Sequence, residues 1–128
     1  MKKIIALVMC LAILCASVSA LAYKTTSYSI NTSSTSEYQI ASSQVTTTGA
    51  NWYITYSSGN LSGSHRAVTR VHKGATAISS TWVYSGSSTT SHPYKSGYTG
   101  GGVSGVTFRG RLDDRDSGTL LMSGNFNY

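Results

Sequence analysis

In two runs near the C-terminus of this chain, 103–112 and 119–128, most of the large apolar residues fall on alternate positions. In the first run, Val106, Phe108 and Leu112 share one parity. A period of two places alternate side chains on opposite faces of a β-strand. Both runs therefore predict half-buried strands. The apolar residues that share a parity in the second run are Leu120, Met122, Phe126 and Tyr128.

The segment between the two runs, Asp113-Asp114-Arg115-Asp116-Ser117-Gly118, is polar and suits a hairpin loop. We therefore expect the two runs to pair as an antiparallel hairpin whose apolar sides supply much of the core. Glycines inside predicted strands often mark bulges or close contacts with a neighbouring aromatic ring. The glycines to which this applies are Gly105, Gly110 and Gly124.

The rest of the chain also favours strands, because it is rich in Ser and Thr, contains 9 Tyr and 13 Gly, and has few helix formers. The sequence predicts an all-β fold, a small antiparallel β-sandwich or flattened barrel of six to eight strands. We expect one strand in which Trp52, Ile54 and Tyr56 share a face. We expect another continuous strand at 75–84. The remaining strands are expected at 23–30, 37–45 and 66–72, with loops at 31–36, 46–50 and 96–102.

The first 22 residues have the pattern of a cleaved signal peptide. Two lysines follow Met1, residues 4–15 are apolar but too short to cross a bilayer, and small residues follow. Cleavage is expected after Ala20 or Ala22. We therefore predict a secreted or cell-wall-associated protein with one domain, residues 23–128, and no transmembrane anchor after signal cleavage.

Known catalytic and metal-binding patterns are missing from the sequence. Both cysteines, Cys10 and Cys15, lie in the predicted signal peptide, which leaves no disulfide or thiolate in the domain. The histidines lack metal-ligand spacing, and no G-x-S-x-G motif occurs. We expect neither enzymatic activity nor a cofactor or metal. One alternative is a calcium loop at 113–116, where oxygen-bearing residues alternate before a glycine, but turn chemistry explains that loop equally well.

Basic residues suggest a binding surface. Without Lys2 and Lys3, eight Lys and Arg remain against four acidic residues, a net charge of +4. Alternation places Arg66, Arg70 and His72 on one strand face and Arg109 and Arg111 on another. If these faces share one sheet surface, they form a cationic patch that suits an anionic cell-wall polymer or envelope lipid. Nucleic acid is not expected as a partner of a secreted protein. The alternative is a solvated face whose charges prevent edge-to-edge aggregation.

Aromatic residues allow a third interpretation, a carbohydrate-binding module that stacks sugars on exposed rings. Tyr94 and Tyr98, beside the glycine-rich loop, are the pair that packing explains least. The other candidate rings also fit core packing. They are Trp52, Tyr53, Tyr56, Trp82 and Tyr84.

Several short motifs resemble those of short secreted β-proteins of Gram-positive bacteria. There is also a fainter similarity to lactococcin-like bacteriocins, which are small, exported, cysteine-free β-sandwich peptides that interfere with wall synthesis. That similarity implies, as an alternative, an antibacterial protein acting on the cell envelope, but no functional residue carries over. The motifs are Trp52-Tyr53-Ile54, Thr81-Trp82-Val83, His92-Pro93-Tyr94, Phe108-Arg109-Gly110-Arg111, Asp113-Asp114, Ser117-Gly118 and Ser123-Gly124-Asn125-Phe126.

Overall fold

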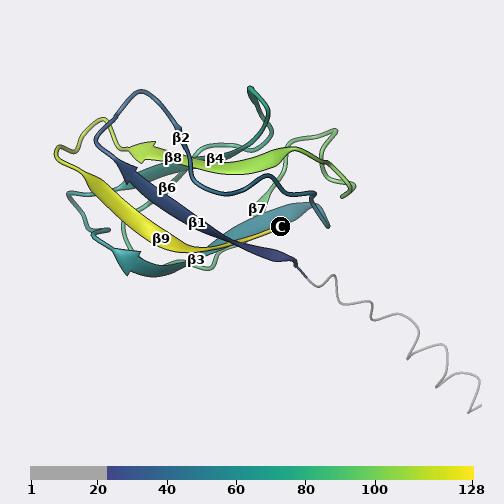
Figure 1. Cartoon of the computed structure of the whole chain (residues 1–128), viewed down its shortest axis with the longest axis horizontal. Helices are drawn as coiled ribbons and strands as arrows, with labels where there is room; N and C mark the ends of the chain where they lie inside the picture. Colours follow the sequence, from purple (N-terminus) through teal and green to yellow (C-terminus); the bar gives the residue numbers. More distant parts are fainter. Residues whose placement is uncertain (1–22) are drawn as a thin grey trace, which may run out of the picture.

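The computed structural model describes residues 23–128, which form two antiparallel sheets packed face to face (Figure 1). The first sheet has the strand order β1-β9-β3-β7. The second has the order β2-β8-β4-β5, and β6 also pairs with β4. The strands are β1 (Thr25–Thr32), β2 (Gln39–Ile40), β3 (Asn51–Gly59), β4 (Ala67–Lys73), β5 (Thr76–Ala77), β6 (Trp82–Tyr84), β7 (His92–Pro93), β8 (Val106–Leu112) and β9 (Leu120–Asn127).

The predicted all-β antiparallel sandwich is confirmed, and within residues 23–128 no helix occurs. Nine strands form in this part of the chain rather than six to eight. The number is higher because it includes three strands of only two residues each, β2, β5 and β7. Isolated bridges join the edges of the sheets without closing them into a barrel. One bridge links Tyr28 to Ser42, and another links Ser79 to Tyr94.

The core lies between the sheets and centres on three aromatic rings. Trp52 of β3 lies 5.9 Å from Phe108 of β8 and 6.2 Å from Phe126 of β9, measured between ring centroids. Phe108 and Phe126 stack at 5.4 Å. All three side chains are fully buried, and such aromatic pairs stabilise a core beyond the area they bury. The predicted inward faces of 103–112 and 119–128 are thus confirmed.

The predicted hairpin between these two runs is wrong. β8 pairs with β2 and β4, whereas β9 pairs with β1 and β3, so residues 113–119 cross from one sheet to the other (Figure 1). Alternation only shows which side chains face the core, and it is the same whichever strand lies alongside. The crossing is held where the backbone N–H of Asp113 donates to the carbonyl of Arg66, at 3.0 Å, just before β4.

The predicted strand at 75–84 is also wrong as a single unit, because it divides into β5 and β6. Both pair with β4, but the side chain of Ser79 interrupts the ladder between them, since its hydroxyl accepts the backbone N–H of Val71 at 2.9 Å. Consequently Ile78 is buried while Trp82 is 37% exposed. The strand expected at 37–45 is also shorter than predicted, because only β2 forms a continuous ladder there. Beyond it, only isolated bridges at Ser42 and Val45 continue the pairing.

Gly124 of β9 occupies a position that no side chain fits. A Cβ atom there would lie 1.8 Å from the backbone oxygen of Thr55 and 3.1 Å from the hydroxyl of Tyr28. The register of β3 against β9 also shifts between Tyr56 and Ser58, next to this contact. The predicted close approach of a glycine to an aromatic side chain is therefore confirmed at this position.

The predicted signal peptide, residues 1–22, lies outside the described residues. From residue 23 onward, no helix has the length and apolar character that crossing a bilayer requires.

We predict that Gly124→Ala lowers the free energy of unfolding by about 2–3 kcal/mol, because the added methyl group overlaps backbone atoms that cannot move aside. Gly63→Ala is the control, since nothing lies within 4 Å of a Cβ there, and its effect should stay within about 0.5 kcal/mol. Urea unfolding of the two purified variants measures the difference. Equal stability of the two variants would contradict the register of β3 against β9.

Candidate functional site

Charge is segregated between the two sheets. β1, β3 and β9 contain no Lys, Arg, Asp or Glu, so the long strands of the first sheet are uncharged. In the second sheet, β4 contains Arg70 and Lys73, and β8 contains Arg109 and Arg111. The outer surface of the second sheet is therefore the charged face of the sandwich.

The register of β4 against β8 gathers three arginines on that surface. Arg70 lies opposite Arg109, and Val68 lies opposite Arg111. The next pair along, Val71 with Phe108, faces the core. The three guanidinium groups therefore share the outer face, as expected from the alternation. We call Arg70, Arg109 and Arg111 the arginine cluster.

Tyr38, immediately before β2, lies against the arginine cluster. The guanidinium carbon of Arg70 is 4.0 Å from the centre of the Tyr38 ring, and that of Arg111 is 5.3 Å away. Both distances are within the range of cation–π attraction. The sequence interpretation missed Tyr38. Tyr38 lies two residues before Ile40 and therefore on the same face of the strand, and Ile40 pairs with Arg109. That pairing would have placed Tyr38 beside the arginines, but the sequence does not predict it.

The hydrogen-bond partners of the cluster are all neutral. Arg109 donates to the hydroxyl of Thr107 at 3.1 Å and to the carbonyl of Gly74 at 2.7 Å. Arg111 donates to the carbonyls of Thr35 and Leu112. Within residues 23–128, no ion pair involves a member of the cluster. Arg109 and Arg111 are thus held in place, and none of the three positive charges is compensated by a carboxylate of the described residues.

Several buried polar atoms in the cluster and next to it lack hydrogen-bond partners. They are Nε of Arg70, the hydroxyl of Tyr38 and both ring nitrogens of His72. Buried polar groups are usually paired, so this grouping is unusual. Burial lowers the pKa of His72, and the charges of Arg109 and Arg70 lower it further. His72 is therefore neutral at pH 7 and adds no charge to the patch.

The phenol of Tyr38 responds to the same charges. Burial raises its pKa, but contacts with Arg70, Arg111 and Thr81 outweigh burial and leave the pKa below its usual value. A lowered phenol pKa is the response expected of an acidic group held among cations. The local potential is thus favourable to negative charge.

Arg66 does not belong to the cluster, which corrects the expected patch. Its side chain binds the carboxylate of Asp116 at 2.7 Å and 3.1 Å, and its backbone N–H donates to the same carboxylate at 2.7 Å. Arg66 lies just before β4, where the crossing segment 113–119 passes. Its charge is therefore compensated and it fixes a loop.

The loop considered as a calcium site is also closed by ion pairs. Arg115 binds both carboxylate oxygens of Asp113 at 2.8 Å, and this contact holds the pKa of Asp113 well below its usual range. Arg66 likewise lowers the pKa of Asp116. Across residues 23–128, no group of three or more His, Cys, Asp or Glu side chains is placed to hold a metal ion. The carboxylates of Asp113 and Asp116 bind guanidinium groups.

The two tyrosines proposed as sugar platforms do not form one. Tyr94 is only 3% exposed and belongs to the core, so the expectation is wrong for this residue. Tyr98 is half-buried and packs against the same core. Among the other candidate rings, Trp82 has an exposed side chain and lines a pocket.

No protein-family model, curated protein or solved structure matches this chain. The resemblance to secreted Gram-positive β-proteins therefore stays a prediction.

We predict that stability falls as the pH is lowered from about 4, the ordinary carboxyl pKa. Asp113 and Asp116 have lowered pKa values in the folded state, so the stabilisation is fully present above pH 4 and is lost as the pH falls through the folded pKa values. Asp113→Asn should cost about 1–3 kcal/mol at pH 7, because the buried carboxylate of Asp113 loses its charged contacts with Arg115 and Arg66. Its stability should also depend less on pH below 4.

Urea unfolding at neutral and acidic pH measures both effects. Glu37→Gln is the control, because Glu37 is exposed and should leave the acid dependence unchanged. An Asp113→Asn variant with the acid dependence of the wild type would show that this ion pair does not secure the crossing.

Proposed function

We propose that the protein is a non-enzymatic secreted or cell-envelope-associated binding module. Its working surface is the arginine cluster, Arg70, Arg109 and Arg111, which binds anionic envelope polymers or the headgroups of envelope lipids. The observation that carries the proposal is the presence of three guanidinium groups on one sheet face without a carboxylate partner among the described residues.

The spacing of the cluster suits phosphate-bearing ligands. Neighbouring strands are about 4.8 Å apart, and residues two apart along a strand are separated by about 7 Å. Arg70 and Arg109 are related in the first way and Arg109 and Arg111 in the second. The three groups are close enough to contact one phosphate or two successive phosphates of a polymer. Guanidinium groups donate paired hydrogen bonds to phosphate oxygens, and these charge-assisted bonds are stronger than neutral ones.

The position of the cluster in the sheet favours binding over protection of a sheet edge. Charges that prevent aggregation belong on edge strands. β4 and β8 are interior strands, flanked by β2 on one side and by β5 and β6 on the other. Like charges directly opposite each other also destabilise a sheet, and Arg70 with Arg109 is such a pair. An anionic ligand would remove this repulsion.

The local hydrogen bonds support the same surface. The partners of Arg109 and Arg111 fix the two side chains without neutralising them. Both residues are half-buried, so part of each stays open to solvent. Groups held in advance lose less conformational entropy when a ligand binds.

We predict that the purified protein sediments with isolated Gram-positive cell walls, and that Arg109→Glu lowers the bound fraction at least about tenfold by reversing a charge in the cluster. Lys24→Glu is the matched control. It changes the net charge equally but lies just before β1, in the other sheet, and should bind nearly as well as the wild type. Sedimentation followed by gel densitometry measures the bound fraction.

The same assay should show binding that weakens as salt increases, because contacts between exposed charges are screened. Walls stripped of their phosphate-bearing polymers should bind less protein. Binding that resists salt, or an equal loss in the Arg109→Glu and Lys24→Glu variants, would overturn the proposed surface.

A further inference from the structure

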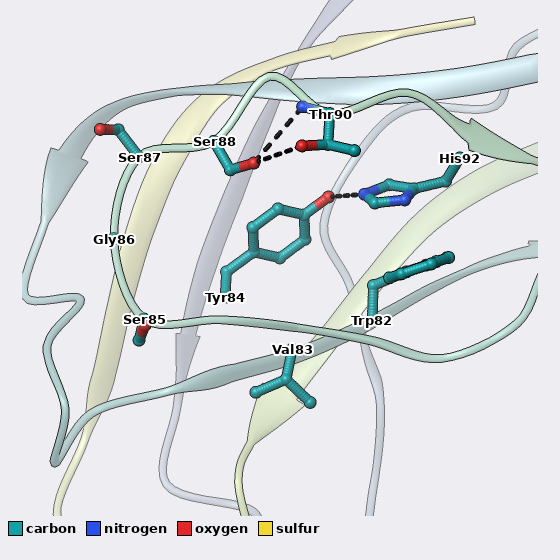
Figure 2. A pocket seen from close by; sticks show the side chains of 9 residues that line it. All are labelled: Trp82, Val83, Tyr84, Ser85, Gly86, Ser87, Ser88, Thr90 and His92. Carbon is teal, nitrogen blue, oxygen red and sulfur yellow. Dashed lines mark hydrogen bonds between the residues drawn. The ribbon is translucent and has the colours of Figure 1, made fainter.

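A pocket of about 340 Å³ lies where β6 leads into the following loop and the chain returns at His92 (Figure 2). This volume is at the small end of the range for ligand sites, about 300–1,000 Å³. No Lys, Arg, Asp or Glu lines the pocket, so its chemistry differs from that of the arginine cluster. The lining residues are Trp82, Val83, Tyr84, Ser85, Gly86, Ser87, Ser88, Thr90 and His92.

One wall of the pocket is a rigid aromatic group. The ring of Trp82 stacks on His92 with centroids 3.9 Å apart and planes inclined by 23°. The hydroxyl of Tyr84 is hydrogen bonded to Nε2 of His92 at 2.7 Å (Figure 2). Tyr84 and His92 are buried, whereas Trp82 is 37% exposed. The buried pair therefore holds an exposed indole in a fixed orientation.

The aromatic wall is electrically neutral. Burial lowers the pKa of His92 and raises that of Tyr84, so neither group carries a charge at pH 7. Nδ1 of His92 is also covered and lacks a hydrogen-bond partner. A charged ligand would find no opposite charge in this pocket.

The opposite wall is a loop rich in hydroxyl groups, 85–90. The hydroxyl of Ser88 accepts the backbone N–H of Thr90 at 3.3 Å, and the two side-chain hydroxyls are 3.1 Å apart (Figure 2). These contacts order the loop, and Ser85, Ser87 and Thr90 remain exposed. The pocket thus combines one exposed apolar ring with several neutral donors and acceptors.

We propose that this pocket binds a neutral pyranose unit of a glycan. The apolar C–H face of the sugar lies against Trp82, and its hydroxyl groups exchange hydrogen bonds with the serine and threonine loop. Hydroxyl groups and an amphipathic ring match both sides of a sugar, which has one apolar face and a polar rim. The site is separate from the arginine cluster and needs no charge on the ligand.

Titration with three neutral tetrasaccharides, chitotetraose, cellotetraose and maltotetraose, tests the proposal. Trp82 is exposed and lines the pocket, whereas Trp52 is buried and touches the pocket only through His92, so an emission change that is lost in Trp82→Ala reports on Trp82. At least one tetrasaccharide should give a saturable change at both low and high salt. Isothermal titration calorimetry supplies a second measurement that does not depend on fluorescence.

Trp82→Ala should weaken binding of that tetrasaccharide at least about tenfold, through loss of the stacking surface. Thr90→Val, which replaces one hydroxyl group with a methyl group, should weaken it less. Tyr53→Ala is the aromatic control, since Tyr53 lies on the first sheet and should leave affinity unchanged. Arg109→Glu should also bind as the wild type does, which separates this site from wall binding. Absence of binding by all three sugars, or an unchanged affinity of Trp82→Ala, would overturn the proposal.

Discussion

The pairing of β4 with β8 determines both the inside and the outside of this sandwich. One register places Val71 and Phe108 in the core and, one residue away on each strand, Arg70 opposite Arg109 on the surface. A slip of a single residue would bury guanidinium groups and expose Phe108. Burial of the aromatic core therefore fixes the positions of the charges. The cluster exists at a cost in like-charge repulsion, and core packing offsets this cost.

Alternation in the sequence was enough to predict which residues of 103–112 and 119–128 face inward, because parity depends only on local backbone geometry. It could not predict the partner strands. A link of a few polar residues can either turn within a sheet or cross between sheets, and the crossing depends on contacts of Asp113 and Asp116 with Arg66, far away in sequence. Ser79 and Tyr38 were missed for the same reason, since each acts through a neighbour that only the folded chain supplies.

The basic residues show that the sequence pattern alone does not predict which charges are paired in the folded protein. Arg66 and Arg70 looked equivalent on one strand face, yet Arg66 is neutralised by Asp116 while Arg70 has no carboxylate partner in the described chain. Likewise Tyr94 was expected as an exposed ring and Trp82 fitted core packing equally well, yet Tyr94 is buried and Trp82 is exposed. The folded protein thus has two chemically different surfaces, a cationic face on β4 and β8 and a neutral pocket at the end of β6, which pairs with β4. A glycan polymer carrying phosphate groups contains chemistry suited to both.

Arg70, Arg109 and Arg111 carry charge that no carboxylate of the described residues compensates, whereas the charges of Arg66 and Arg115 are paired. Nuclear magnetic resonance of the arginine Nε–H groups during titration with pyrophosphate tests this difference most directly. We predict that the signals of Arg70, Arg109 and Arg111 shift with a common affinity. The signals of Arg66 and Arg115 should remain in place because Asp116 and Asp113 already occupy them. Equal shifts of all five signals, or no shift at Arg109 and Arg111, would contradict the claim.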